Sequence, residues 1–326
     1  MVDKNFIASN IERRISEVLD KTGIYYRIFS RQKSEDSIIK KLDSKKDEYS
    51  EDGKKMQDFV GVRVVFYFKD DIEIFLNILR SWESYDPTNE SNSNIELSQL
   101  EEDIKGCGIP KLHNLIPLTD KVFMPERLNL VMKMNKSETE AFNMLMDTQM
   151  KFNSKLIDNT YEIQLRTVLS EGWHEVEHDL RYKTRKEIWW KECQEESRLL
   201  NGIYAALVSN ESQLVSIVDD IAYKAYRNHE WDTMIRFHFR RRTKESKLSD
   251  NISVYLDSHV DDVAKRIHRF ERNSLVENLN KIPFKLDITT DLITYVVNRI
   301  SIHDEYLSGI EPAPIRKALD KAFGVI

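Results

Sequence analysis

The sequence has little of what ties a small or turn-rich fold together. Of its 326 residues, only 2 are cysteine, 9 are glycine and 7 are proline. Two cysteines, Cys107 and Cys193, cannot build a disulfide framework, so we expect a fold held by a buried core in a reducing cytoplasm. The scarcity of glycine and proline argues against a turn-rich β architecture and favours long helices.

Long apolar runs and a leader-like beginning are absent as well. No uninterrupted apolar run approaches the roughly 18 residues that predict a membrane span, and the first residues lack the basic start and apolar run of a signal peptide. A net charge of −6 gives no general attraction to nucleic acid. We therefore expect a cytoplasmic protein without membrane association, long enough for one sizeable domain and a smaller one.

Helices and strands alternate in the first half of the chain, and strand signals almost vanish in the second half. Helical periodicity fills residues 170–245 and 252–325, with breaks near Pro283 and Pro312. The polar stretch 83–110 is typical of a long surface loop. The elements predicted before residue 170 are a helix at 8–20, a strand at 25–30, a helix after Ser34, a central strand at 58–68, a helix from Asp70 to Trp82, a strand at 128–134, a helix or a mobile excursion at 137–150 and a strand at 160–165.

One short run, residues 161–183, fits two incompatible chemistries. His174-Glu-Val-Glu-His178 matches the zinc-protease pattern H-E-x-x-H, in which two histidines one helical turn apart bind a metal and the glutamate activates water. Three fixed letters match often by chance, and Glu177 puts a charge where the helix of a zinc protease is packed in the core. Glu192 and Glu195 are candidate third ligands only because an acidic chain always offers some. Helix packing or surface roles for the two histidines are the better interpretation.

A second set of residues is spread over three segments. The run from Arg31 to Lys41 puts cations and a hydroxyl at the end of a strand and the start of a helix, where backbone N–H groups already favour phosphate. Asp58 begins the central strand and Glu162 lies in a later strand. Two carboxylates on neighbouring strands can hold Mg²⁺, and the metal can hold a triphosphate. Polyphosphate-binding cations and a carboxylate pair together indicate phosphoryl or pyrophosphoryl transfer.

These segments, RQKSEDSIIKKL, DFVGVRVVFYFKDDI and YEIQLRTVLSEGWHEVEHDLRYK, resemble the synthetase domain of RelA/SpoT proteins, most of all the small single-domain alarmone synthetases. The resemblance covers roughly residues 8–185, and it implies that the H-E-x-x-H match is part of a helix that the family shares. It implies an α+β fold: a nucleotidyltransferase-like mixed β-sheet flanked by helices, followed here by an all-helical C-terminal region. We accordingly predict a pyrophosphokinase domain at 1–188 and a helical domain at 189–326.

The resemblance also implies roles for single residues. Asp58 and Glu162 would be catalytic and bind Mg²⁺, with Glu162 either sharing the metal or acting as the base for the attacking 3′-hydroxyl. ATP would be the pyrophosphate donor. Ordinary sheet packing is the alternative for the supporting positions. The residues expected to bind ATP are Arg31, Lys33, Ser37, Lys41, Arg63, Gln164 and Arg166.

The loop that binds the acceptor departs from the family pattern. After Asp120 and Pro125, the family's lysine is replaced by Glu126, its Gly-Tyr pair is absent and the loop is several residues short. The guanine therefore loses its stacking tyrosine unless Phe123 replaces it. The residues expected to bind the acceptor are Lys121, Phe123, Arg127 and Asn129.

Three acceptors or functions follow from this departure. The first is GDP or GTP in a rearranged pocket. The second is the 3′ end of tRNA, as in toxic family members of toxin–antitoxin or anti-phage systems, with the basic run 236–247 holding the RNA backbone; a solvated helix face is the alternative for that run. The third is a non-catalytic nucleotide-binding signalling module, against which the carboxylate pair argues. The helical region 189–326 could serve oligomerisation, act as an antitoxin-like neutralising segment or sense a partner. As partners of the chain we expect a second copy in a homo-oligomer or an antitoxin.

Overall fold

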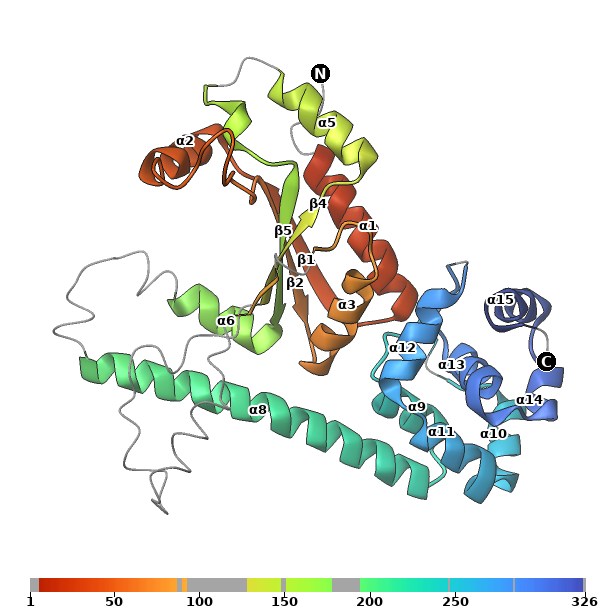
Figure 1. The fold of residues 1–326 in the computed structure, drawn as a ribbon. Coiled ribbons are helices and arrows are strands. Elements are labelled where there is room, and N and C mark those ends of the chain that lie inside the picture. The colour runs from red at the N-terminus through yellow and green to blue at the C-terminus, as the bar shows by residue number, and fades with distance from the viewer. Residues whose placement is uncertain are drawn as a thin grey trace, which may run out of the picture. The chain divides into compact units, whose positions relative to one another are not determined.

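The computed structural model describes residues 6–86, 90–92, 128–147, 151–177, 194–245, 247–283 and 285–324. The chain divides into two compact units (Figure 1). The first unit comprises 1–12, 27–72 and 80–212, and the second comprises 13–26, 73–79 and 213–326. Three helices, α1 (Phe6–Thr22), α3 (Asp70–Arg80) and α8 (Gln194–Arg227), have residues in both units.

A mixed five-stranded sheet forms the centre of the first unit (Figure 1). Its strand order is β1-β2-β5-β4-β3, so the neighbours β2 and β5 are distant in sequence. Strand β2 pairs in parallel with β5, whereas β4 pairs with β5 and with β3 in antiparallel fashion. The strands are β1 (Tyr26–Gln32), β2 (Val60–Phe66), β3 (Glu90–Asn92), β4 (Leu128–Lys133) and β5 (Thr160–Thr167).

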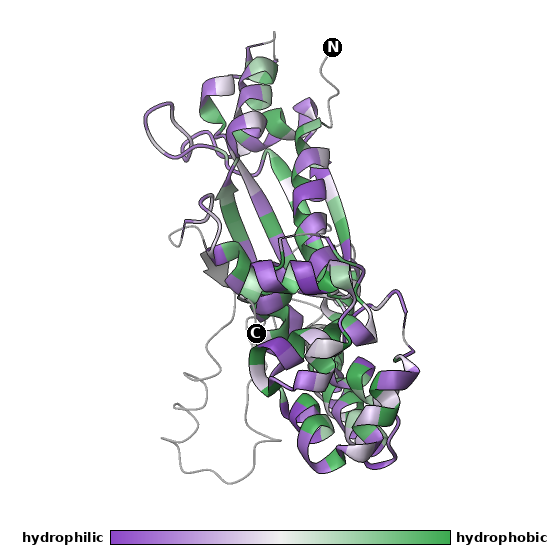
Figure 2. Ribbon diagram, turned by 90° about the vertical axis from the view of Figure 1, so that its right-hand side faces the viewer, coloured by the Kyte–Doolittle hydropathy of each residue, from purple (hydrophilic) through white to green (hydrophobic). Residues whose placement is uncertain are grey.

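The two faces of the central strands differ because successive side chains of a strand point to opposite sides. One face of β2 and β5 carries apolar residues that are at most 1% exposed, namely Val60, Val62, Val64, Phe66, Tyr161, Ile163 and Leu165. The other face carries Gly61, Arg63, Glu162, Gln164 and Arg166. Figure 2 shows hydrophobic residues along the strands. Burial of the apolar face stabilises the sheet and fixes which side chains are left for chemistry.

Side-chain caps define where the helices around the sheet begin. Ser34 accepts a hydrogen bond from the backbone N–H of Ser37 and starts α2 (Glu35–Ser44). Asn135 and Glu138 form a reciprocal capping box at the start of α5 (Lys136–Met146). At the end of β5, the hydroxyl of Thr167 accepts from the N–H of Ser170 at 3.1 Å, so the chain passes directly from the strand into α6 (Val168–Glu177). A short 3₁₀ helix, Ser154–Leu156, precedes β5.

The second unit is helical and has its own apolar core. Trp231, Phe239 and Ile293 are at most 1% exposed within it. Its elements are the C-terminal part of α8, α9 (Trp231–Phe239), α10 (Asp250–Ser258), a π-helix (Val260–Ala264), α11 (Lys265–Arg269), α12 (Arg272–Lys281), α13 (Thr290–Val297), a second π-helix (Asn298–Ile302), α14 (Glu305–Gly309) and α15 (Ala313–Phe323).

The fold class expected from the sequence is confirmed, and most predicted elements are found within a few residues of their expected ends. The exception among described residues is β3, which lies inside the stretch 83–110 predicted to be loop, because a three-residue strand gives no periodic signal. The domain boundary predicted at residue 188 lies outside the described residues and stays a prediction. No helix in the described part of the chain is long and apolar enough to cross a bilayer.

Candidate active site

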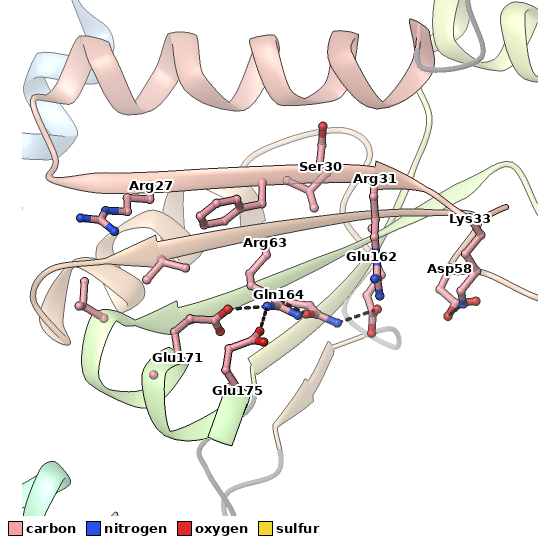
Figure 3. A pocket seen from close by; sticks show the side chains of 16 residues that line it. Arg27, Ser30, Arg31, Lys33, Asp58, Arg63, Glu162, Gln164, Glu171 and Glu175 are labelled. Carbon is pink, nitrogen blue, oxygen red and sulfur yellow. Dashed lines mark hydrogen bonds and ion pairs between the residues drawn. The ribbon is translucent and has the colours of Figure 1, made fainter. Parts of the chain in front are cut away.

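A cavity of about 680 Å³ lies over the polar face of the sheet in the first unit (Figure 3). Its walls come from β1, β2, β5 and α6. Its charged lining residues are Arg27, Arg31, Lys33, Asp58, Arg63, Glu162, Glu171 and Glu175. Equal numbers of cations and carboxylates therefore face one space, and their pairing decides which of them a ligand can contact.

Two lysines contact Asp58, which lies just before the start of β2. The backbone N–H of Lys33 donates to the carbonyl of Phe59 at 2.9 Å, which places the end of β1 beside the start of β2. Oδ2 of Asp58 accepts from Nζ of Lys33 and from Nζ of Lys41, the latter at 2.7 Å. Burial raises the pKa of Asp58, but the two hydrogen bonds and charges outweigh it, so its pKa lies below the usual value. The carboxylate is ionised at neutral pH.

The pKa values of the two lysines that contact Asp58 shift in opposite directions. Burial lowers the pKa of Lys33, and its contact with Asp58 does not restore it. Burial also acts on Lys41, but there the hydrogen bond to Asp58 prevails and raises the pKa. Oδ1 of Asp58 is buried and accepts no hydrogen bond from the described residues. Asp58 thus keeps one oxygen with lone pairs that a cation or a water can use.

Glu162 belongs to β5 and lines the cavity. In the register of the sheet it lies opposite Gly61 of β2 and Val131 of β4. Its Oε2 accepts from Nε2 of Gln164 at 3.1 Å, and it has no ion pair with any described residue. A Cβ on Gly61 would meet no atom within 4 Å, so the space beside Glu162 is open. The carboxylate is accessible to a ligand and is not neutralised by a neighbour.

An ion-pair network forms the wall between the sheet and α6. Arg63 donates to Glu171, to Glu175 at 2.8 Å and to Oε1 of Gln164 at 3.2 Å. Glu171 also accepts from Arg166 at 2.9 Å, and the Arg166 side chain is only 4% exposed. Glu171 and Glu175 are one turn apart on α6, so both reach Arg63. The network fixes Arg63 and aligns α6 against β2 and β5.

Arg27 and Arg31 extend from alternate positions of β1 and line the cavity (Figure 3). Neither makes a hydrogen bond or an ion pair with the described residues. Phe29 lies between them on the same face and is 56% exposed. The cavity therefore offers two unengaged guanidinium groups, one carboxylate without an ion-pair partner among the described residues and one exposed aromatic ring, a combination that suits an anionic ligand with an aromatic part.

Comparison with known proteins connects this geometry to a family. Residues 30–187 match the family model described as "Region found in RelA / SpoT proteins". The chain contains a RelA/SpoT region. This confirms the resemblance expected from the sequence, and the matched region supports a pyrophosphokinase, with ATP as the donor that the family implies.

Solved structures with a related fold come from several bacteria. Small alarmone synthetase 1 from Bacillus subtilis, bound to its product pppGpp, is 17% identical, and the match covers 66% of this chain and 92% of that chain with a TM-score of 0.43. A GTP pyrophosphokinase family protein from Streptococcus pneumoniae is also 17% identical, with 66% and 88% covered and a TM-score of 0.42. No curated protein matches the sequence.

The predicted ATP-binding residues of the RelA/SpoT region occupy different places around the cavity. Arg31, Lys33, Arg63 and Gln164 line it, together with the predicted catalytic pair Asp58 and Glu162. Lys41 reaches it only through Asp58. Arg166 is buried beneath α6, and the exposed Ser37 lies outside the lining with its hydroxyl 2.9 Å from that of Ser34. The roles of these residues stay predictions.

The predicted acceptor residues are mostly not described. Lys121, Phe123 and Arg127 lie outside the described residues. Asn129 is in β4 and pairs in register with Gln164, which in turn pairs with Arg63. Asn129 therefore lies in the same cross-strand row as Gln164 and Arg63, which line the cavity.

The alternative zinc site gains no support from the RelA/SpoT region as described. His174 is buried in α6, and His178 lies outside the described residues. Among the described residues, no group of three His, Cys, Asp or Glu side chains is arranged to hold a metal. Glu175 of the H-E-V-E-H run is instead a partner of Arg63.

Sequence reasoning missed several residues of the cavity. Arg27 and Phe29 follow the period of two that places them on the face of Arg31, so extending the alternation of β1 backward from Arg31 would have found them. Glu171 and Glu175 carry the helical spacing of four, but their partner Arg63 is more than 100 positions away, and no local pattern predicts that contact. Gly61 gave no signal in the sequence, because what it contributes to the cavity is the absence of a side chain.

Proposed function

We propose that this chain transfers the β,γ-pyrophosphate of ATP to the 3′-hydroxyl of a guanosine nucleotide in a Mg²⁺-dependent reaction. The observation that carries the proposal is the meeting of Arg31, Lys33, Asp58 and Glu162 at one cavity of a RelA/SpoT region. The cations suit a triphosphate, and the carboxylates suit a metal and a base.

The residues present fit Mg²⁺. This ion is held by one or two carboxylates together with substrate phosphates and water, so it does not need a cage of protein ligands. Asp58 offers its unbonded Oδ1 and Glu162 offers a carboxylate without a cationic partner. When bound, the ion would neutralise phosphate charge. Asp58 is already ionised at neutral pH because Lys33 and Lys41 lower its pKa.

Residues of the cavity account for each part of the proposed chemical step. The 3′-oxygen of the acceptor forms a bond to the β-phosphorus of ATP, and the bond from that phosphorus to the α,β-bridging oxygen breaks. AMP leaves with the electron pair, and Glu162 takes the proton of the 3′-hydroxyl. Arg31 and Lys33 hold the phosphate oxygens, whose charge is redistributed during transfer. Gln164 keeps Glu162 oriented through its 3.1 Å hydrogen bond.

A guanosine acceptor is favoured over the 3′ end of tRNA by the state of the basic run 236–247. Arg240 and Arg241 are buried in the second unit. Arg242 pairs with Asp20 at 2.7 Å, Lys244 with Asp287 at 2.7 Å and Lys247 with Asp250 at 3.3 Å. Buried cations cannot reach an RNA backbone, and the three paired cations, which are more than half exposed, would have to exchange a carboxylate for a phosphate.

Transfer of label from γ-labelled ATP tests the proposal. We expect label in GDP or GTP, dependence on Mg²⁺, and loss of at least about 100-fold in rate for Glu162→Gln, since general-base catalysis contributes 10²- to 10⁴-fold. Glu195→Gln, an exposed position on α8, is the matched control and should be fully active. Label in tRNA alone would select the other acceptor. Absence of transfer to GDP, GTP, ATP and tRNA would contradict the proposal.

A further inference from the structure

Two histidines of the second unit stack on each other and take no part in the proposed reaction. His238, near the end of α9, and His268, in α11, have ring centroids 5.2 Å apart and ring planes inclined by 28°. Tyr226, in the part of α8 that belongs to the second unit, also stacks on His268, at 5.0 Å and 27°. Helices α9 and α11 contact each other (Figure 1). The pair His238–His268 is therefore part of the contact between these two helices.

A hydrogen bond fixes where His238 carries its proton. Its Nε2 lies 2.9 Å from the carbonyl oxygen of Phe270. Because a carbonyl oxygen can only accept, Nε2 must hold a hydrogen, and the neutral ring keeps its lone pair at Nδ1. A second proton therefore binds at Nδ1 and charges a ring that is stacked on another imidazole. Two charged rings at this distance repel each other, so the stack favours neutral histidines.

The charged groups around the pair are of both signs. Asp219 of α8 is a carboxylate that acts on both rings, but it is 56% exposed and lies 4.0 Å from Arg240. Arg240 brings positive charge toward His238, and Arg269 brings it toward His268. The other titratable side chains beside the pair are Tyr223 and Tyr226 of α8, and Arg272 of α12, which donates to the carbonyl of Phe239 at 3.1 Å.

Both histidines resist protonation in the folded chain. Burial lowers the pKa of His238, and the hydrogen bond to Phe270 offsets this only in part. Burial and the nearby charge of Arg269 lower the pKa of His268. When the folded-state pKa of a histidine is lowered, its stabilisation is present above the unfolded value near 6.5 and is lost as pH falls from there toward the folded pKa. Mild acid therefore favours a state in which the rings are apart and hydrated.

We propose that the pair His238–His268 is an acid-sensitive latch, which holds α9 against α11 at neutral pH and releases it in mild acid. The latch lies in the second unit and is independent of the proposed function. A charge on either ring draws in water and weakens the stack, so the two helices separate locally. Ile293 and Val296 of α13 belong to the apolar core of the same unit and do not titrate, so this helix should respond less.

Hydrogen exchange of the full chain at two pH values tests the latch. After correction for the intrinsic rates, the protection of amides in α9 and α11 should fall about tenfold between about pH 7.5 and about pH 5.5, and that of α13 should change less. His268→Phe keeps a stacking ring that cannot be protonated, so its α9 and α11 amides should stay protected at both pH values. An equal loss in α13, or the wild-type loss in His268→Phe, would overturn the latch.

His303→Asn is the matched control. It removes an exposed imidazole outside the pair, and asparagine tolerates the φ of 59° at this position. The variant should respond to pH as the wild type does, and a lost response would overturn the latch. NMR titration of the wild-type imidazoles needs no variant that folds. Rings of His238 and His268 that titrate at the usual value near 6.5 would overturn the latch as well.

Discussion

Asp58 shows how a single side chain keeps its charge in a half-buried position. Its carboxylate has 23% of its surface exposed and shares Oδ2 between Lys33 and Lys41. Breaking such a cluster on one side leaves two like charges close together without compensation, which costs more than the cluster itself contributes. Lys33 of this cluster lines the cavity, so the residue proposed to hold the metal also holds a proposed phosphate-binding cation in place.

We predict that Asp58→Asn lowers the free energy of unfolding at pH 7 by about 2 kcal/mol. Because the folded-state pKa of Asp58 is lowered, its stabilisation is present above the unfolded value near 4 and disappears as pH falls through the folded pKa. Urea unfolding at several pH values measures the difference between wild type and variant. It should be largest near neutrality and shrink below about pH 4; a difference that grows with acidity would contradict the assignment.

The same variant separates phosphate binding from transfer. Removing the negative charge leaves Lys33 and Lys41 free for anions, so tripolyphosphate should bind Asp58→Asn at least as tightly as wild type in the absence of Mg²⁺. Transfer of label should nevertheless fall by 100-fold or more, on the order of one lost catalytic group. Titration and the label assay, done on one preparation, check both. A variant that loses tripolyphosphate binding would show that Asp58 acts by positioning the lysines.

At the scale of elements, strand pairing brings the predicted catalytic residue Glu162 beside an open position of the sheet. Gly61 of β2 lies opposite Glu162 of β5, with no atom within 4 Å of where its Cβ would be. Gly61→Ala should leave stability unchanged or raise it by a few tenths of a kcal/mol, about what a compatible Gly-to-Ala change gives. Gly61→Leu should fold but lose transfer, because its side chain occupies the space beside Glu162. Thermal unfolding and the label assay distinguish the two effects.

Retained activity in a folded Gly61→Leu variant would contradict this use of the space. The control is Gly309→Leu in the second unit, where a Cβ also meets nothing within 4 Å. That variant should transfer label at the wild-type rate.

Helix α6 offers two glutamates that bind the same arginine with very different burial. Glu171 is 16% exposed and bridges Arg63 to the buried Arg166, whereas Glu175 is 59% exposed. Glu171→Gln should lower the free energy of unfolding by about 2 to 3 kcal/mol, since a nearly buried charge loses its partner. Glu175→Gln, the matched control, should cost less than about 1 kcal/mol. Equal effects in urea unfolding would show that the network does not hold α6.

Local patterns predicted the elements well because hydrophobic period and caps are local. Val60, Val62 and Val64 identify β2, and Ser34 identifies the start of α2. The meeting of Asp58 and Glu162 at one cavity was expected from the chemistry of the two carboxylates and supported by the family resemblance, since parallel pairing across about 100 residues leaves no local signal. The partners Glu171 and Glu175 of Arg63 and the emptiness at Gly61 depend on three-dimensional packing, so the sequence could not give them.

At the scale of the whole molecule, the two units hold different features, which can be tested separately. The first holds the cavity, and the second contains a buried cluster in which Arg299 donates to Glu311 at 2.7 Å and pairs with Asp320 at 2.9 Å. Both side chains of the inner pair are at most 3% exposed. We predict that Glu311→Gln lowers the free energy of unfolding by about 3 kcal/mol, because Arg299 keeps only part of its compensation. Urea unfolding followed by circular dichroism measures this change.

Binding of a nucleotide tests whether that damage spreads to the cavity. All residues that line the cavity belong to the first unit. The α,β-methylene analogue of ATP at 100 times its dissociation constant should stabilise the wild-type chain by about 2.7 kcal/mol, because it binds only the folded state. Glu311→Gln should bind the analogue with unchanged affinity at a temperature where it is folded. Weakened binding would contradict the independence of the cavity from the Arg299 cluster.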